Sequence, residues 1–377
     1  MKKIIVLGAG MVGSAMALDL ADKHEITSTD LDKKVLDKLK NKNPEIQTSL
    51  LDVTNKEELH KTIKPFDLIV CAVPGFLGFQ TLKHIIEAGK DVVDISFFPE
   101  NALELDDLAK QNNVTAIVDC GVAPGMGNII LGYHNEQIKV TDFECLVGGL
   151  PKIKKWPFNY KAPFSPIDVI EEYTRPARYV ENNKLITRDA LSDVEHVDFD
   201  KAGTLESFNS DGLRSLIFTM PNIPNMKEKT LRYPGHVEYI RVLKETGFFD
   251  SEEIDINGKK ISPIDLTNKI LFKEWKLKDN EEEITVMKIT IKGIDKKGNK
   301  TKIIYDLYDE YDPKTQISSM ARTTGYTATA AANLLLEGVY DEKGVFPPEL
   351  VGKHKACYEF VLNYLEERNV VYEKSVV

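Results

Sequence analysis

The chain has 377 residues and a formal net charge of −10, with 42% hydrophobic and 29% charged residues. This length fits two domains better than one core, and the composition is typical of a water-soluble globular protein. The acidic balance and the lack of a basic block argue against nucleic acid or anionic membrane as a partner. No apolar run reaches the roughly 18 residues that a membrane helix needs. We therefore expect a cytoplasmic protein.

The chain opens with "MKKIIVLGAG", which begins like a signal peptide. Glycines interrupt it at once and no small-residue cleavage site follows, so we interpret it as a first strand. Through the first third, short apolar runs alternate with amphipathic stretches such as "NKEELHKTI". Six strands with crossover helices predict a parallel, doubly wound sheet. The predicted strands are Lys3–Leu7, Ile26–Thr29, Ile46–Leu50, Leu68–Ala72, Val92–Ile95 and Thr115–Val118.

After about Gly125 the runs become longer and alternate, as in "VTDFECLVGGL", "TLESFNSDGL" and "ITVMKITIKGI". The last run, "DKKGNK" and "TKIIYDLYDEY" together predict an antiparallel hairpin. An Ala-rich helical run, "GYTATAAANLLLEGV", follows near Thr324. The expected fold class is α/β: a Rossmann doubly wound parallel sheet plus a second mixed α/β domain with a mostly antiparallel sheet. We expect a nucleotide domain at 1–124, a substrate domain at 125–321, and C-terminal helices at 322–377 that return to the first domain.

A GxGxxG motif lies directly after the first strand, where Gly8, Gly10 and Gly13 open a helix. Gly8 allows the tight turn, Gly10 lets the backbone approach a pyrophosphate, and Gly13 lets the helix pack on the strand. The helix N-terminus at Met11 and Val12 offers N–H groups to the phosphates. This context predicts a dinucleotide site.

Asp30 ends the second strand, 22 residues after Gly8. A carboxylate there accepts the ribose hydroxyls of NAD and repels the 2′-phosphate of NADP, so we predict NAD, with NADP second. Lys33 and Lys34 could instead hold that phosphate, or simply cover the next helix. Further cofactor contacts are expected at the carboxyl edge of the sheet, from Asp52, Val53, Ala72, Val73, Pro74 and Gly121.

Other cysteine and histidine patterns point away from metal chemistry. Cys71, Cys120, Cys145 and Cys357 share no metal-like spacing, and the seven histidines form no i, i+4 pair, so we predict no metal. The first three cysteines lie in strand-like runs and are expected to be buried, reduced thiols.

Longer motifs carry a family resemblance: "GAGMVG", "DCGVAPGMGN", "VGGLP", "EEYTRPAR", "SDGLRS", "TLRYPGH" and "ARTTGYTA". Together they resemble the saccharopine dehydrogenase (saccharopine reductase) family, most closely its NAD-dependent lysine 6-dehydrogenase branch. The resemblance implies a homodimer that oxidatively deaminates the side-chain amine of an amino acid. Members closer to saccharopine reductase instead join or cleave a second amino acid at the imine. The family insert "NPLGYKFSW" is present only as "WPFNYKAPFS", with Tyr160, Lys161 and Ser165, which leaves the size of the substrate open.

The implied chemistry needs a neutral amine, because an ammonium has no lone pair to assist hydride loss. A lysine amine is almost fully protonated at neutral pH, so the site must supply a base or desolvate the ammonium. Asp119, at the end of the sixth strand, could contact the substrate or cap the following turn. His236 could be the general base or a helix-terminal histidine. Both are therefore candidate catalytic residues.

The far end of the substrate calls for a cationic and an anionic contact. Arg214 and Arg232 could bind a carboxylate in two places, or pair with surface acids. Asp211 could accept the ammonium or cap its own turn, and Tyr160 is a further substrate candidate. Donors could also come from Arg322, Thr323 and Thr324, whereas surface positions are expected for His24, His60, His84, His196 and His354.

We conclude that the sequence predicts NAD-dependent oxidative deamination of lysine or a lysine-like amine to a semialdehyde, ammonia and NADH. The alternative is a saccharopine-type reductase that joins or cleaves a semialdehyde and a second amino acid. A non-catalytic NAD-binding sensor is the alternative from another class; the polar groups at Asp119, Arg214, Arg232 and His236 argue against it.

Overall fold

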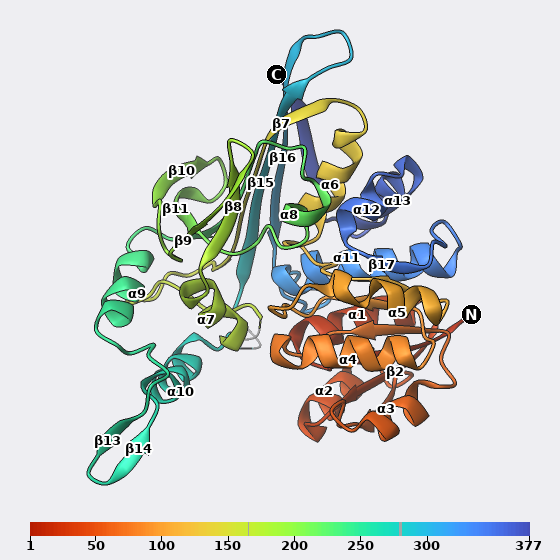
Figure 1. The fold of residues 1–377 in the computed structure, drawn as a ribbon. Coiled ribbons are helices and arrows are strands. Elements are labelled where there is room, and N and C mark those ends of the chain that lie inside the picture. Colours follow the sequence, from red (N-terminus) through yellow and green to blue (C-terminus); the bar gives the residue numbers. More distant parts are fainter. Residues whose placement is uncertain (165, 279–280) are drawn as a thin grey trace.

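Two β-sheets organise the molecule (Figure 1). The computed structural model describes residues 1–164, 166–278 and 281–377. None of the helices in these ranges is long and apolar enough to cross a membrane. The predicted fold class, a Rossmann sheet plus a second mixed domain, is confirmed.

The first sheet is parallel, with the strand order β17-β6-β5-β4-β1-β2-β3. All six predicted strands are present, and no strand end is shifted by more than one residue. The seventh strand, β17, comes from near the C-terminus and pairs with β6. Its strands are β1 (Lys3–Leu7), β2 (Glu25–Asp30), β3 (Gln47–Leu50), β4 (Leu68–Cys71), β5 (Val92–Asp94), β6 (Thr115–Ile117) and β17 (Gly344–Phe346).

The central strands of this sheet are buried on both faces, which explains why β1 and β4 are continuous apolar runs. Ile4 and Val6 belong to one hydrophobic cluster, and Ile5 and Leu7 belong to another on the opposite face. The covering helices are α1 (Met11–Ala21), α2 (Lys33–Lys42), α3 (Lys56–Ile63), α4 (Gly75–Glu87), η1 (Ala102–Leu105) and α5 (Asp106–Gln111). Helix α11 (Ser319–Leu336) packs against α1.

The second sheet has the order β10-β11-β12-β7-β15-β16-β18, with β8 and β9 attached at β12. Only the β12–β7 pairing is parallel, so the predicted mostly antiparallel sheet is confirmed. Its strands are β7 (Lys139–Pro151), β8 (Ala177–Glu181), β9 (Lys184–Arg188), β10 (Glu195–Phe199), β11 (Gly203–Asn209), β12 (Asn225–Arg232), β15 (Glu283–Ile294), β16 (Lys300–Glu310) and β18 (Tyr372–Val376).

The predicted hairpin is present as β15 and β16, which pair along their whole length. Part of the C-terminal segment 322–377 lies on the first domain, where α11 packs against α1 and β17 pairs with β6, but its last strand, β18, pairs with β16 of the second sheet. A short hairpin, β13 (Ile254–Ile256) and β14 (Lys259–Ile261), projects from the rest of the molecule (Figure 1). The remaining helices are α6 (Met126–Asn135), α7 (Pro166–Thr174), α8 (Leu216–Thr219), α9 (His236–Glu245), α10 (Pro263–Trp275), α12 (Pro348–Gly352) and α13 (Lys355–Glu366).

Candidate active site

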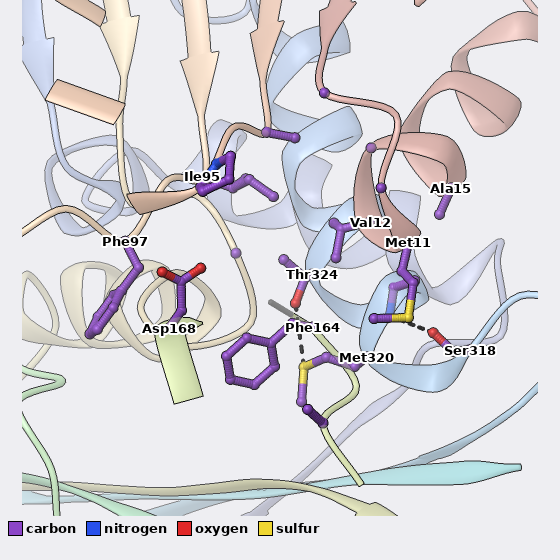
Figure 2. Close-up of a pocket in the computed structure, with 18 of the residues that line it drawn as sticks. Met11, Val12, Ala15, Ile95, Phe97, Phe164, Asp168, Ser318, Met320 and Thr324 are labelled. Carbon is purple, nitrogen blue, oxygen red and sulfur yellow. Dashed lines mark hydrogen bonds between the residues drawn. The ribbon is translucent and has the colours of Figure 1, made fainter. Parts of the chain in front are cut away.

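A cavity of about 1360 Å³ is lined by residues of both sheets and by the start of α11. Figure 2 shows part of it, with Met11 and Val12 of α1 on one side and Phe97 and Asp168 on the other. Eleven of the twelve predicted cofactor residues line it: Gly8, Gly10, Met11, Val12, Gly13, Asp30, Val53, Ala72, Val73, Pro74 and Gly121.

The glycine loop has the shape that a dinucleotide requires. Gly8 has φ +96°, and a Cβ there would lie 2.5 Å from the Ala72 carbonyl oxygen. A Cβ at Gly13 would lie 2.0 Å from the Gly8 carbonyl oxygen, so only glycine permits this strand–helix contact. A Cβ at Gly10 would have no atom within 4 Å, and no side chain caps the N-terminus of α1. The residues present therefore fit a pyrophosphate group.

Asp30 lines the far end of the same cavity. Its carboxylate accepts hydrogen bonds from the backbone N–H of Ala9 (2.8 Å) and of Asp32 (2.9 Å). Three lysines of α2, spaced four residues apart, line this end as well: Lys34, Lys38 and Lys42. Lys33 does not; it pairs with Asp37 at 2.7 Å.

Asp52 is the exception among the predicted cofactor residues. It does not line the cavity, and its carboxylate accepts hydrogen bonds from the N–H and the hydroxyl of Thr54, at 2.9 and 2.6 Å. These bonds hold the pKa of the Asp52 carboxyl below its usual value. Asp52 is therefore an Asx-turn residue.

The wall opposite the glycine loop is built by alternate residues of β12, namely Glu228, Thr230 and Arg232, and by the adjacent stretch Val147–Gly149 of β7. Successive side chains of a strand point to opposite faces, so these three share the cavity face. The arginine is 2% exposed. Its guanidinium donates to the carboxylate of Glu172 and to the Tyr173 hydroxyl (3.1 Å).

Two more ion pairs lie at the end of the cavity that the second domain forms. Asp211 accepts two hydrogen bonds from the Arg178 guanidinium, at 2.9 and 2.8 Å. Arg175 donates to Glu171 at 3.2 and 2.9 Å and lies over the Phe97 ring. Among the residues that the structure describes, none makes a hydrogen bond to the buried Nη1 of Arg175. The second-domain end can thus present both signs of charge to a zwitterionic ligand.

Asp119 and Arg214, both predicted to contact substrate, instead form a buried ion pair with each other. The Arg214 Nε donates to the two Asp119 oxygens at 2.8 and 2.9 Å, and its Nη1 donates to the Phe98 carbonyl. Each side chain is 5% exposed, and neither lines the main cavity. The pair ties the end of β6 to the loop after β11. This placement argues against both substrate assignments.

His236 also lies outside the cavity lining. Its Nδ1 and Nε2 lie 2.9 Å from the Phe158 carbonyl and the Tyr173 hydroxyl, respectively. Burial, together with the charge of Arg232, lowers the pKa of His236 to about 3. A neutral imidazole with both nitrogens engaged is a poor general base at neutral pH, so this geometry counts against the predicted role.

The remaining candidates lie behind the cavity or outside it. Tyr160 is buried beneath Arg232, whose guanidinium lies 4.4 Å from its ring centroid, and it does not line the cavity. Thr324 does line it, whereas Arg322 pairs with Asp309 and Thr323 is fully buried. Ser165 lies outside the described residues.

The cysteines and the remaining histidines are placed as follows. Cys71, Cys120, Cys145 and Cys357 are all buried and unpaired by disulfides, as predicted for the first three. Of the histidines expected at the surface, only His196 is exposed; the half-buried ones are His24, His60, His84 and His354. The described residues hold no group of three or more His, Cys, Asp or Glu arranged to bind a metal ion.

Three further charged residues line the cavity without having been predicted from the sequence: Glu228, Glu172 and Arg175. The last two lie in "EEYTRPAR", a motif that was recognised without roles for its charges. Glu228 lies two residues before the "TLRYPGH" motif and four before Arg232. Residues two apart on a strand share one face, so the spacing of Glu228 from Arg232 could have placed both on the cavity face.

Comparison with known proteins identifies the family of both domains. Residues 4–117 match the family model described as the saccharopine dehydrogenase NADP binding domain, and residues 121–371 match the saccharopine dehydrogenase C-terminal domain. Carboxyaminopropylagmatine dehydrogenase of Synechocystis sp. is 24% identical over 374 residues, covering 93% of this chain and 92% of that protein.

Other relatives extend this picture. The L-glutamate-forming, NADP(+) saccharopine dehydrogenase of Schizosaccharomyces pombe is 25% identical over 66% of this chain and 59% of that protein. The chain spans only about half (47%) of bovine alpha-aminoadipic semialdehyde synthase, at 22% identity. The fold matches apo L-Glu-forming saccharopine dehydrogenase from Saccharomyces cerevisiae with a TM-score of 0.80, at 19% identity over 100% of both chains. The chain therefore belongs to the saccharopine dehydrogenase family, as the motifs predicted, and is an oxidoreductase of the amino-acid dehydrogenase class with a nicotinamide-cofactor domain.

Proposed function

We propose that the protein oxidises or forms a carbon–nitrogen bond in an amino-acid-derived amine, joining or cleaving a semialdehyde and a second amine in the manner of saccharopine dehydrogenases. The observation that carries the proposal is the single cavity, with a dinucleotide-shaped end and an ion-paired end. Its volume of about 1360 Å³ exceeds the roughly 300–1,000 Å³ of ordinary ligand pockets. That volume suits a dinucleotide together with a two-part substrate.

A bound nicotinamide dinucleotide would supply the hydride acceptor. The glycine loop and the N-terminus of α1 would hold its pyrophosphate, and Ala72, Val73 and Pro74 would run past its nicotinamide end. At the other end, Arg232 is the arginine we assign to a substrate carboxylate, because it lines the cavity whereas Arg214 does not.

Oxidative deamination of a lysine-like amine is the second candidate. The departure of "WPFNYKAPFS" from the insert common in saccharopine-cleaving members favours it, because the altered segment includes Ala162 and Phe164 of the cavity wall. A smaller substrate would then occupy the same end.

Product analysis separates the candidates. The purified protein is incubated with NAD or NADP and a panel of amines and amino acids, and the products are identified by mass spectrometry. Formation or cleavage of a secondary amine supports the first proposal, and ammonia release without a second amine product supports the second. Cofactor binding without turnover of any amine in either direction would instead fit a non-catalytic sensor.

The predicted homodimer rests on the family resemblance alone. Light scattering of the purified protein tests it, and a mass near 42.5 kDa would contradict it. The cytoplasmic location likewise stays a prediction.

A further inference from the structure

Glu228 has an unusual position for a carboxyl group. It lies on β12, opposite Cys145 of β7, and its side chain lines the cavity although the residue is only 7% exposed. Among the described residues, no hydrogen bond or ion pair reaches its carboxyl group. The carboxyl lies so close to Gly212 that a Cβ there would be 1.8 Å from Oε1.

Other buried carboxyls whose pKa is raised all have partners. Asp94 accepts from the Ser96 N–H, and Glu283 accepts from the N–H groups of Ser319 and Met320. Similar partners bind the carboxyls of Glu172, Asp309 and Glu349. Buried polar groups in folded proteins are normally satisfied, so an exception at a cavity wall points to a ligand.

The charges around Glu228 favour its neutral form. Burial raises the pKa of Glu228 to about 8, and the negative charges of Asp211, Glu172 and Asp119 add to the effect while Arg214 opposes it. The cations nearby are committed elsewhere: Arg178 to Asp211, Arg232 to Glu172 and Arg214 to Asp119. The carboxyl is therefore poised to exchange a proton at neutral to mildly alkaline pH.

We propose that Glu228 exchanges the proton with the substrate nitrogen, a role that rests on the proposed carbon–nitrogen oxidoreduction. In the oxidation direction the Glu228 carboxylate takes a proton from the substrate ammonium. The N–H bond breaks, an O–H bond forms, and the electron pair stays on nitrogen. That pair would then assist loss of hydride from the adjacent carbon, for which a bound nicotinamide dinucleotide would supply the acceptor. In the reverse direction the protonated Glu228 returns the proton to nitrogen.

The first test needs neither cofactor nor substrate. Glu228→Gln removes the titrating group while keeping its shape. Below pH 4.5 the Glu228 carboxyl is protonated in both the folded and the unfolded chain. Between pH 4.5 and about 8 it stays protonated in the folded chain but loses its proton in the unfolded chain. The free energy of unfolding of the wild type therefore falls as the pH rises through this window. The melting temperature of Glu228→Gln, relative to wild type, should therefore climb with pH across this window and level off above it.

The matched control is Glu144→Gln. Glu144 lies on the neighbouring strand β7, is paired with Lys227 at 2.9 Å and does not line the cavity. Its difference from wild type should show no such climb. A Glu228→Gln difference that stays flat between pH 4.5 and 8 would show an ordinary carboxyl and overturn the proposal.

The second test is the pH profile of amine oxidation. Wild-type kcat/KM should rise through a step near pH 8, and Glu228→Gln should lose that step together with about 10²–10⁴-fold in rate. Gly212→Ala, which displaces the carboxyl without removing it, should also slow turnover while leaving cofactor affinity unchanged. Glu144→Gln should behave as wild type.

The outcomes separate the two proposals. Wild-type rate and an unchanged step in Glu228→Gln would overturn the proton role and leave the proposed function standing. If wild type turns over no amine in either direction although it binds the cofactor, the proposed function fails and the proton role fails with it.

Discussion

At the scale of single residues, Asp119 and Arg214 join the two domains through a buried ion pair. Asp119 follows β6 of the first sheet, and Arg214 follows β11 of the second. Both side chains are almost fully buried. Sequence position pointed to both residues as substrate contacts, and it could not show that each is the other's partner.

Arg214→Ala should destabilise the protein by about 3–5 kcal/mol, because it leaves the Asp119 charge buried without its cation. Denaturant unfolding measures the loss. The double variant Asp119→Asn/Arg214→Met should be less damaging, because it removes both charges. If Arg214→Ala leaves the free energy of unfolding unchanged and only raises KM, Arg214 binds the substrate instead.

Arg232 is the arginine for which a substrate role survives. Arg232→Ala should lower kcat/KM, and the loss should correspond to about 2–4 kcal/mol of transition-state stabilisation because a charge-assisted pair with the substrate is lost. The affinity for the cofactor should be nearly unchanged. Arg322→Ala is the matched control: Arg322 is also buried and ion-paired, to Asp309, but lies outside the cavity. If both variants lose stability equally and neither changes kcat/KM, Arg232 has a structural role only.

At the scale of elements, the central strands β1 and β4 of the first sheet were predictable because they are buried on both faces. Such strands are continuous apolar runs between turn residues, and they carry a strong local signal. The strands β9 and β10 are mostly exposed, so their sequences show no clear apolar period. The strand β12, "NMKEKTLR", looks like a surface segment; its buried Glu228, Lys229 and Arg232 depend on tertiary surroundings that no local pattern reveals.

We expect the junction of β2 and α2 to decide between NAD and NADP, because Asp30, Lys34 and Lys38 all line the cavity there. Asp30 favours NAD, whereas Lys34 and Lys38 provide charge for a 2′-phosphate. We predict that wild type binds NAD more tightly, and that Asp30→Ala narrows the gap by about 1 kcal/mol or more. Lys34→Ala should weaken NADP without affecting NAD. Calorimetric titration of each variant with both cofactors measures these changes, and tighter binding of NADP by wild type would reverse the assignment of Asp30.

At the scale of the whole molecule, the last part of the chain completes both sheets. The strand β17 extends the first sheet beside β6, and β18 extends the second beside β16. Neither was predicted. The run "GVF" is too short to show a period, and "YEKSV" is mostly exposed, so both owe their conformation to the strand edge that they meet.

The two strands should differ when they are removed. Deleting 371–377 takes away only β18, retains the ion pair of Arg368 with Asp19, and removes no residue that lines the cavity. The edge of β16 would be uncovered, so we expect a lower melting temperature and more aggregation, but an unchanged affinity for the cofactor.

Deleting 340–377 also removes β17, α12 and α13. This deletion exposes the edge of β6 and the buried faces of α6 and α11, and it should abolish cooperative folding. Thermal unfolding and cofactor titration of both truncations test the distinction. Loss of cofactor binding in the shorter deletion, at a temperature where the protein stays folded, would show that β18 supports the nucleotide site through the second sheet.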